Sequence, residues 1–306
     1  MKPKRPGLGY LAALTSAALV GLFTVLNKWL LIKEVPALTA GAWTYFAAGI
    51  ALLPWAVRAG GLKLQRPWVV AGWLLTGTVV GPTLYFLGLQ LTSGVQGVLL
   101  INTEAVFTAF LAVAFFHERV TDKTIVGGLA IVVGGIVMSW PESGGKLLAG
   151  PTLGNLLIAV GCLSWATENN LGRLLGKDVP AVTLVCVKAL AAALVMGVLA
   201  VVFRQGLQVP WRVVPGIVAS GAVALACSLA FFYIAMQHIG SGRTGLVSST
   251  SILWGVVAAL LLLHERLTPV VIVGGLLMLG GLLELAWEAT AKKEGGDTPQ
   301  KMRWLD

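Results

Sequence analysis

The chain is a succession of long apolar stretches separated by short polar gaps. Stretches close to the roughly 20 residues that an α-helix needs to cross a bilayer predict membrane-spanning helices. The gaps between them are too short to hold a soluble domain. The pattern predicts an all-α integral membrane protein with ten transmembrane helices, over residues 8–30, 36–57, 67–89, 94–116, 123–140, 151–173, 180–203, 211–237, 242–263 and 268–288.

Composition supports this reading. The sequence is 57% hydrophobic and 11% charged, with a mean hydropathy of +0.86, which lies far outside the range of soluble domains. The formal charge of +9 is spread over the gaps rather than along a stripe, so we expect no nucleic-acid partner. Cys162, Cys186 and Cys227 lie in apolar stretches without CxxC spacing, and we therefore expect packing residues, no metal and no cofactor.

The distribution of basic residues predicts the orientation. If the N-terminus is cytoplasmic, that side carries 15 of the Lys and Arg residues and the opposite side carries 6, with Lys188 inside a span. Such an excess fits the positive-inside rule, so we expect a multi-pass protein of a bacterial inner membrane with both termini in the cytoplasm. The polar end of the chain, 291–306, is predicted to be a mobile cytoplasmic tail.

An internal repeat divides the chain into two halves. The segment His117-Glu-Arg-Val-Thr121 recurs as His264-Glu-Arg-Leu-Thr268, a shift of 147 residues. We therefore expect two five-helix units, 1–145 and 146–290. Because five is odd, the second unit crosses the membrane in the opposite sense, an inverted repeat typical of carriers that alternate between inward and outward openings. A duplicated bundle without transport is the structural alternative.

The repeated motifs resemble a known family. Tyr85-x-x-Gly-Leu-x-x-Thr-Ser-Gly94, Phe115-Phe-His-Glu-Arg-Val-Thr121 and Ile131-Val-Val-Gly-Gly-Ile-Val-Met138 together resemble the EamA half-unit of the drug/metabolite transporter superfamily, and the segment from Tyr233 to Leu283 resembles it again. The resemblance covers residues 8–288. It implies a ten-helix carrier that exports amino acids or related metabolites, with bacterial amino-acid exporters, including the aromatic amino-acid exporter group, similar in length and layout.

Two positions depart from the family pattern. The family often has a Glu-Pro step in the fourth span, where this chain has Glu104-Ala105, and the second copy has Ser251-Ile252. Neither helix therefore carries the usual proline break. Trp165-Ala166 resembles the aromatic-small pair in the opening helix of a unit in the family, whereas the first copy has Val20-Gly21.

Polar residues inside spans are candidates for substrate binding, because each must pair within the bundle or line a wet cavity. The fourth and ninth spans carry equivalent stripes spaced i, i+7 and i+11, which place one face of each helix near the pseudo-axis. Ordinary packing through small residues is the alternative. The candidates for a substrate site are Gln96, Thr103, Phe107, Arg243, Thr250 and Trp254, with the hydroxyl run Ser248 to Ser251 and the deep aromatic residues Trp43 and Trp165.

Three charged residues lie deep in the predicted spans. Glu168 and Lys188 have matching depths in adjacent helices and can meet as an ion pair, either to neutralise each other or to bind substrate or couple transport to protons. Glu104 has no cationic residue in its own span. It either shares a hydrogen bond with a neighbouring helix or exchanges protons during transport.

The sequence also bears on functional classes other than a transporter. A membrane-embedded enzyme needs clustered acid, base or metal-binding groups, and no such cluster or nucleotide-binding motif is present in the sequence. We interpret the two His-Glu-Arg loops as structural locks at helix ends, with gating as the alternative. The partners that we expect are a small solute and the bilayer, for a chain able to act as a monomer and open to dimerisation. A non-transporting assembly subunit remains an alternative.

Overall fold

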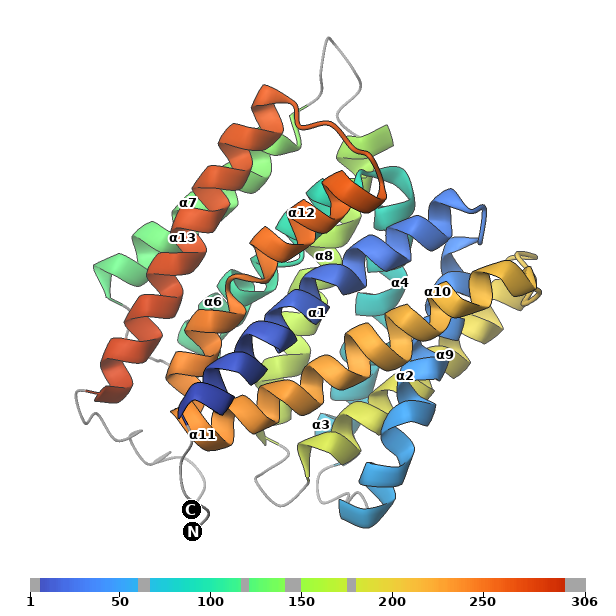
Figure 1. Cartoon of the computed structure of the whole chain (residues 1–306), viewed down its shortest axis with the longest axis horizontal. Coiled ribbons are helices and arrows are strands. Elements are labelled where there is room, and N and C mark those ends of the chain that lie inside the picture. Colours follow the sequence, from blue (N-terminus) through green and yellow to red (C-terminus); the bar gives the residue numbers. More distant parts are fainter. Residues whose placement is uncertain (1–5, 60–66, 117–120, 141–149, 175–179, 295–306) are drawn as a thin grey trace.

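The computed structural model describes residues 6–59, 67–116, 121–140, 150–174 and 180–294, and the described residues form helices and connecting turns without any strand. Figure 1 shows the helices side by side in one bundle. In chain order they are α1 (Pro6–Ile32), α2 (Ala37–Ala59), α3 (Pro67–Leu74), η1 (Leu75–Val80), α4 (Gly81–Leu91), α5 (Gly94–Leu100), α6 (Thr103–Phe116), α7 (Asp122–Met138), α8 (Gly150–Leu174), α9 (Ala181–Val202), η3 (Trp211–Val213), α10 (Val214–Val218), η4 (Ala219–Cys227), α11 (Ser228–Ser248), α12 (Ser251–Leu262) and α13 (Pro269–Glu294).

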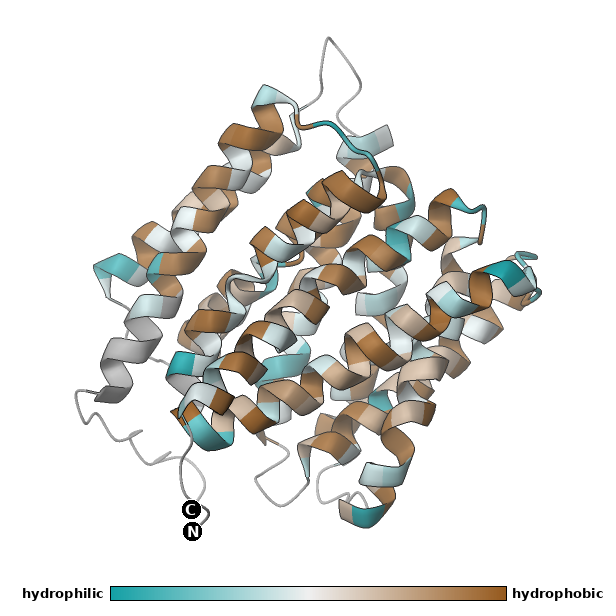
Figure 2. Ribbon diagram, viewed as in Figure 1, coloured by the Kyte–Doolittle hydropathy of each residue, from teal (hydrophilic) through white to brown (hydrophobic). Residues whose placement is uncertain are grey.

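The helices agree with the predicted apolar stretches. In the described part of the chain, seven helical segments are long and apolar enough to cross a membrane, and 269–285 is a shorter apolar helix. Large apolar side chains such as Leu11 and Phe110 are more than 60% exposed, as lipid-facing residues are. Figure 2 shows hydrophobic residues over most of each helix. The protein is therefore a multi-pass helical membrane protein, and the total of ten spans stays a prediction.

Helix packing pairs equivalent parts of the two halves. α2 packs against α9, and α7 packs against α13. α1 packs against α11 and α12, just as α8 packs against α4 and α6. The first span of each half therefore packs against the third and fourth spans of the other half. The predicted tail begins inside α13, which continues to Glu294, and residues 295–306 lie outside the described range.

Glycines allow α7 and α13 to pack closely. A Cβ on Gly134 would lie 2.5 Å from the carbonyl oxygen of Gly274, and one on Gly127 would lie 2.8 Å from that of Gly281. Without side chains at these positions, the two backbones approach each other directly, as small residues permit in membrane helices. The glycine-rich faces of these two helices thus pack against each other.

The third and eighth predicted spans are each interrupted by a π-helical segment. The first, η1, lies immediately before Gly81 and Pro82. Pro82 has no N–H to donate, and the N–H of Gly81 bonds to the carbonyl of Thr76 across a wider turn. The hydroxyl of Ser164 donates to the same carbonyl at 3.0 Å. The second π-helical segment, η4, occupies the equivalent region of the second half.

The fourth and ninth spans are also broken, although neither carries the family's proline. α5 ends at Leu100 and α6 begins at Thr103, while α11 ends at Ser248 and α12 begins at Ser251. Polar side chains at both breaks bond to carbonyls of their own helix. The Asn102 amide donates to Val98 O at 2.8 Å, and the Thr250 hydroxyl donates to Val247 O at 2.7 Å. Such bonds compete with the helical pattern, which explains a break without proline.

Candidate functional site

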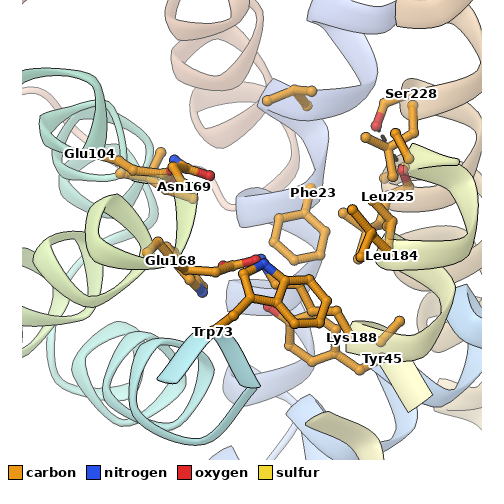
Figure 3. A pocket seen from close by; sticks show the side chains of 18 residues that line it. Phe23, Tyr45, Trp73, Glu104, Glu168, Asn169, Leu184, Lys188, Leu225 and Ser228 are labelled. Carbon is orange, nitrogen blue, oxygen red and sulfur yellow. Dashed lines mark hydrogen bonds and ion pairs between the residues drawn. The ribbon is translucent and has the colours of Figure 1, made fainter. Parts of the chain in front are cut away.

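A cavity of about 370 Å³ lies in the middle of the bundle. We call the end of the bundle where α1 and α9 begin the terminal end, and the end where α4 meets α5 the corner end. The cavity is lined by the middle of α1 and reaches Ala181, the first residue of α9. It therefore extends from the centre towards the terminal end. Figure 3 shows Glu104 and Glu168 on one side of it and Leu184 and Leu225 on the other, with Phe23 between them.

An ion pair crosses the cavity wall between two helices. Lys188 of α9 donates to Oε2 of Glu168 of α8 at 2.5 Å, and both residues line the cavity. The side chain of Glu168 is 6% exposed and that of Lys188 is 24% exposed, so the ammonium group is the more accessible partner. The predicted meeting of these two residues is confirmed, whereas their role stays a prediction.

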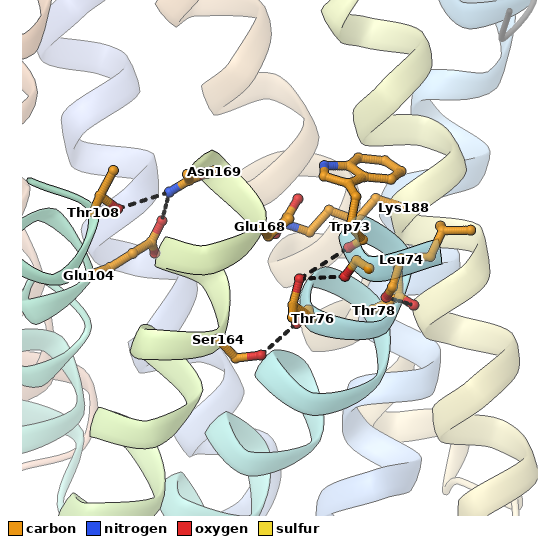
Figure 4. A network of polar contacts seen from close by, with 11 residues as sticks. Trp73, Leu74, Thr76, Thr78, Glu104, Thr108, Ser164, Glu168, Asn169 and Lys188 are labelled. Atoms are coloured by element: carbon orange, nitrogen blue, oxygen red, sulfur yellow. Dashed lines mark hydrogen bonds and ion pairs between the residues drawn. The ribbon is translucent and has the colours of Figure 1, made fainter. Parts of the chain in front are cut away.

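Gly77 of the π-helical segment η1 brings that backbone directly against the Glu168 side chain. A Cβ on Gly77 would overlap the carboxylate carbon of Glu168. The nearby hydroxyls of Thr76 and Thr78 donate to carbonyls of the preceding helix α3 (Figure 4). The widened turn and the missing side chain together make room for the carboxylate beside the cavity.

A second carboxylate lies on the opposite side of α8. Glu104 of α6 accepts a hydrogen bond of 2.7 Å from the side-chain amide of Asn169, which also lies 3.4 Å from the Thr108 hydroxyl (Figure 4). Glu104 and Asn169 both line the cavity. Glu104 therefore hydrogen-bonds to a neighbouring helix, and whether it also exchanges protons during transport stays a prediction. The site thus combines one ammonium group with two carboxylates.

Aromatic residues form much of the remaining wall. Phe23, Tyr45, Trp73 and Trp165 line the cavity together with aliphatic side chains of α9 and η4. Behind them, the fully buried Tyr85 stacks on Phe23 with ring centroids 6.2 Å apart and packs against Trp165 at 5.4 Å. Large flat side chains offer apolar contact surface to a ligand at the same time as the charges orient it.

The corner end is held together by polar contacts. The Thr92 hydroxyl lies 2.5 Å from Oδ1 of Asn155 in α8 and 2.7 Å from Oε1 of Gln96. The Gln96 amide in turn donates to Met138 O of α7 at 2.9 Å. These contacts tie the α4–α5 turn to two neighbouring helices, and no residue of that turn is among those that line the cavity.

Neither of the two predicted stripes lines the central cavity. Gln96 belongs to the polar contacts of the corner end. Thr103 and Phe107 line a separate cavity of about 350 Å³ among α6, α7 and α8. In the second stripe, Arg243 is exposed, Thr250 bonds within its own helix, and Trp254 is 46% exposed. The helices carrying the stripes touch through Gly255 and Val98, but the stripe side chains themselves point elsewhere.

The remaining candidates are divided between the cavity and the outer parts of the bundle. Trp165 lines the central cavity. Trp43 instead donates to Leu207 O at 2.9 Å and lies in an apolar groove between α2 and α9. Ser251 is buried and Ser248 is half-buried at the break between α11 and α12, and neither lines the central cavity. The His117 loop lies outside the described residues.

Several cavity residues were not predicted from the sequence. Trp73 is 4% exposed and comes one turn before Gly77. Its position in an interrupted span was the sequence feature that could have identified it as a cavity residue. Phe23 and Tyr45 are aromatic residues in the first two spans and have no sequence neighbour that marks them. Only the packing of α1 and α2 around the cavity distinguishes them from other buried aromatic residues.

The apolar helices and the charged central cavity are those of a multi-pass membrane protein. In the described residues, no group of three His, Cys, Asp or Glu side chains is arranged to hold a metal ion. The profile of the EamA-like transporter family matches residues 7–140 and, a second time, residues 152–287. The chain belongs to the EamA-like transporter family, and the family assigns it transport of a solute across a membrane.

Two relatives are named as transporters, and a solved structure has the same fold. An uncharacterized transporter of Methanothermobacter thermautotrophicus (strain Delta H) is 25% identical over 296 residues, which cover 91% of this chain and 86% of the relative. The uncharacterized transporter YyaM of Bacillus subtilis (strain 168) is 27% identical over 150 residues, 46% of this chain and 48% of the relative. A crystal structure with 19% identity superposes with a TM-score of 0.60, covering 90% of this chain and 98% of that one, and shows the same fold.

Proposed function

We propose that this EamA-family protein is a secondary transporter that exports amino acids, aromatic or other apolar ones in particular, by alternating access. The observation that supports this proposal best is the composition of the central cavity. It places the Lys188 ammonium group, the Glu104 and Glu168 carboxylates and an aromatic wall around one space of about 370 Å³. Such a space suits a small molecule with opposite charges at one end and an apolar body at the other.

The ion pair provides a way to bind a zwitterion. The substrate carboxylate takes a place beside Lys188 and its ammonium group a place beside Glu168, so that each protein charge exchanges one partner for another. Because no charge is left alone, the exchange avoids the cost of a buried unpaired ion. The apolar side chain of the substrate packs on Trp73 and Phe23.

The orientation that we propose makes the direction export. With both termini in the cytoplasm of a bacterial cell, the terminal end faces the cytoplasm, and the cavity extends towards that end. In this conformation the site is loaded from inside. The two halves, 1–145 and 146–290, then act as the inverted repeats whose relative movement exposes the site to the other side. We propose that the chain is able to act as a monomer.

Efflux of amphipathic cations is a second candidate, favoured by a different observation. The cavity carries two carboxylates against one ammonium group, an excess of negative charge. Aromatic rings attract cations in addition. An organic cation with an apolar body therefore fits the same space. A non-transporting assembly subunit is the third candidate, without a structural feature in its favour.

The test is uptake into proteoliposomes that hold the purified protein. Labelled phenylalanine, threonine and methionine are offered, and tetraphenylphosphonium represents the amphipathic cations, each with a pH gradient imposed or absent. Trp73→Ala removes a cavity aromatic residue, and Trp254→Ala is the matched control at the outer surface of α12. We expect saturable uptake of phenylalanine and methionine that Trp73→Ala abolishes and Trp254→Ala leaves in place.

Each other outcome selects a different conclusion. Uptake of tetraphenylphosphonium without any amino acid uptake makes cation efflux the function. Loss of uptake in Trp254→Ala with full activity in Trp73→Ala moves the binding site to the ninth-span stripe. No uptake of any compound by folded protein excludes both transport proposals for these substrates.

A further inference from the structure

The turn between α4 and α5, at the corner end, is held by two charged side chains from outside it. The carboxylate of Glu265, in the connection between α12 and α13, accepts hydrogen bonds from the backbone N–H groups of Gly94 at 2.6 Å and Val95 at 2.8 Å. The ammonium group of Lys28, in α1, donates to the carbonyl of Leu89 at 3.0 Å and lies 3.4 Å from that of Gln90. We call this set of contacts the corner clamp.

The two charges match the groups that the turn leaves free. The last carbonyls of α4 and the first N–H groups of α5 have no partners within their own helices. The ammonium group meets the carbonyl end and the carboxylate meets the N–H end, which is the favourable arrangement at each helix terminus. Lys28 and Glu265 thus carry opposite charges at the two open ends of the turn. The corner clamp therefore satisfies both open ends of the turn with one pair of opposite charges.

The Glu265 contacts of the corner clamp join the two halves of the chain at the corner end. Glu265 belongs to the second half of the chain, while Gly94 and Val95 belong to the first half. A Cβ on Gly94 would lie 2.5 Å from a methyl carbon of Leu263, so the turn and the α12–α13 connection are in direct contact. α1 and α12, which carry the clamping residues or lead to them, pack together through Gly21 and Gly255.

The chemistry of these contacts suits a reversible closure. Both partners of each bond are polar groups at the end of the bundle, and water replaces the lost hydrogen bonds when they part. His264, which precedes Glu265, has a φ of 53°, in the left-handed region that a non-glycine residue seldom occupies. This backbone conformation turns the chain so that Glu265 contacts the start of α5. A conformation of this kind costs energy, and it persists because the surrounding contacts stabilise it.

We propose that the corner clamp is the gate of the corner end: Lys28 and Glu265 hold the α4–α5 turn shut while the cavity is accessible from the terminal end, and their release opens the cavity at the corner end. This inference concerns movement of the bundle and does not depend on which solute the cavity binds.

The test measures access to the cavity by chemical labelling. Leu225→Cys, on the cavity wall, is placed in a background with Cys162, Cys186 and Cys227 replaced by Ala. A membrane-impermeant maleimide is applied to intact cells and, separately, to inside-out vesicles. A second protein with Gln208→Cys, an exposed position at the corner end, identifies which preparation presents that end. We expect Leu225→Cys to react from the terminal end and only slowly from the corner end.

Glu265→Gln and Lys28→Gln are then introduced one at a time. Each removes a charge-assisted contact, so we expect labelling from the corner end to rise by about tenfold, and labelling from the terminal end to fall. Glu34→Gln, an exposed carboxylate at the same end, is the matched control and leaves both rates unchanged. The proposal is overturned if both variants leave the corner-end rate unchanged, or if labelling rises equally from both ends, because a general loosening of the bundle produces that result.

Discussion

Lys188 and Glu168 form an ion pair of 2.5 Å between α9 and α8, and they are the two charged residues of the second half that line the cavity. Removal of one partner leaves a charge that the bundle does not compensate. We expect Lys188→Met alone to lower the free energy of unfolding by about 3–5 kcal/mol, the usual cost of breaking a buried pair. Thermal unfolding in detergent measures the effect.

The double variant Glu168→Gln with Lys188→Met separates stability from transport. Because it removes both charges, we expect it to regain most of the stability that Lys188→Met loses, while substrate uptake stays absent. Uptake at the level of the unchanged protein in a stable double variant would show that the pair has only a structural role.

Gly77 is expected to be intolerant of even the smallest side chain. Because a Cβ at this position overlaps the Glu168 carboxylate, Gly77→Ala should displace that carboxylate and lower the rate of uptake by about tenfold, with a loss of stability of about 1–3 kcal/mol. Gly245→Ala serves as the control, since no atom lies within 4 Å of the added methyl group there. Equal behaviour of the two variants in uptake and unfolding would argue against close packing of η1 on Glu168.

The contact between α7 and α13 makes a prediction about stability alone. Gly134→Val places a branched side chain against the backbone of Gly274, and we expect the thermal midpoint in detergent to fall by several degrees. Gly280→Val, on the same pair of helices but facing open space, should leave the midpoint nearly unchanged. A midpoint that falls equally in both variants would indicate a general intolerance of valine and no close approach of the two helices.

The cysteines differ in the access that the fold allows to a thiol reagent. Cys162 is fully buried, with its sulfur 3.6 Å from the carbonyl oxygen of Leu100, and Cys186 is 2% exposed. Cys227 is partly exposed. We expect maleimide to modify at most Cys227 in the folded protein and all three after denaturation, as counted by mass spectrometry. Rapid modification of Cys162 in folded protein would contradict the packing of α8 against the break between α5 and α6.

The apolar pattern located the helices well, because the hydrocarbon core of a bilayer sets the length and the apolar character of each span. Both properties can be read directly from the sequence. Pro82 is a sequence signal for the interruption of the third span, since proline removes a backbone donor in any packing arrangement. The breaks at Asn102 and Thr250 were less visible. Each break depends on a polar side chain that bonds to its own helix instead of to a neighbouring helix. The residues packed around that side chain decide which bond forms.

The site was predicted in part for the same reason. Glu168 and Lys188 could be matched by depth alone, because charges inside a membrane need partners and few partners exist. The stripe that contains Thr250 and Trp254 followed from helical spacing, but spacing fixes only which residues share a face. It does not fix the rotation of that face about the helix axis.

By itself, the sequence determined the membrane solvent, the helices, the repeat and the family, all of which depend on the chemistry and order of residues along one dimension. Only the tertiary structure decided that Trp73 and Phe23 face the cavity while Trp254 faces outwards, and that Glu265 contacts the α4–α5 turn 170 residues away. The physical reason is that these relations depend on how whole helices rotate and pack, and that packing is set jointly by side chains distant in sequence.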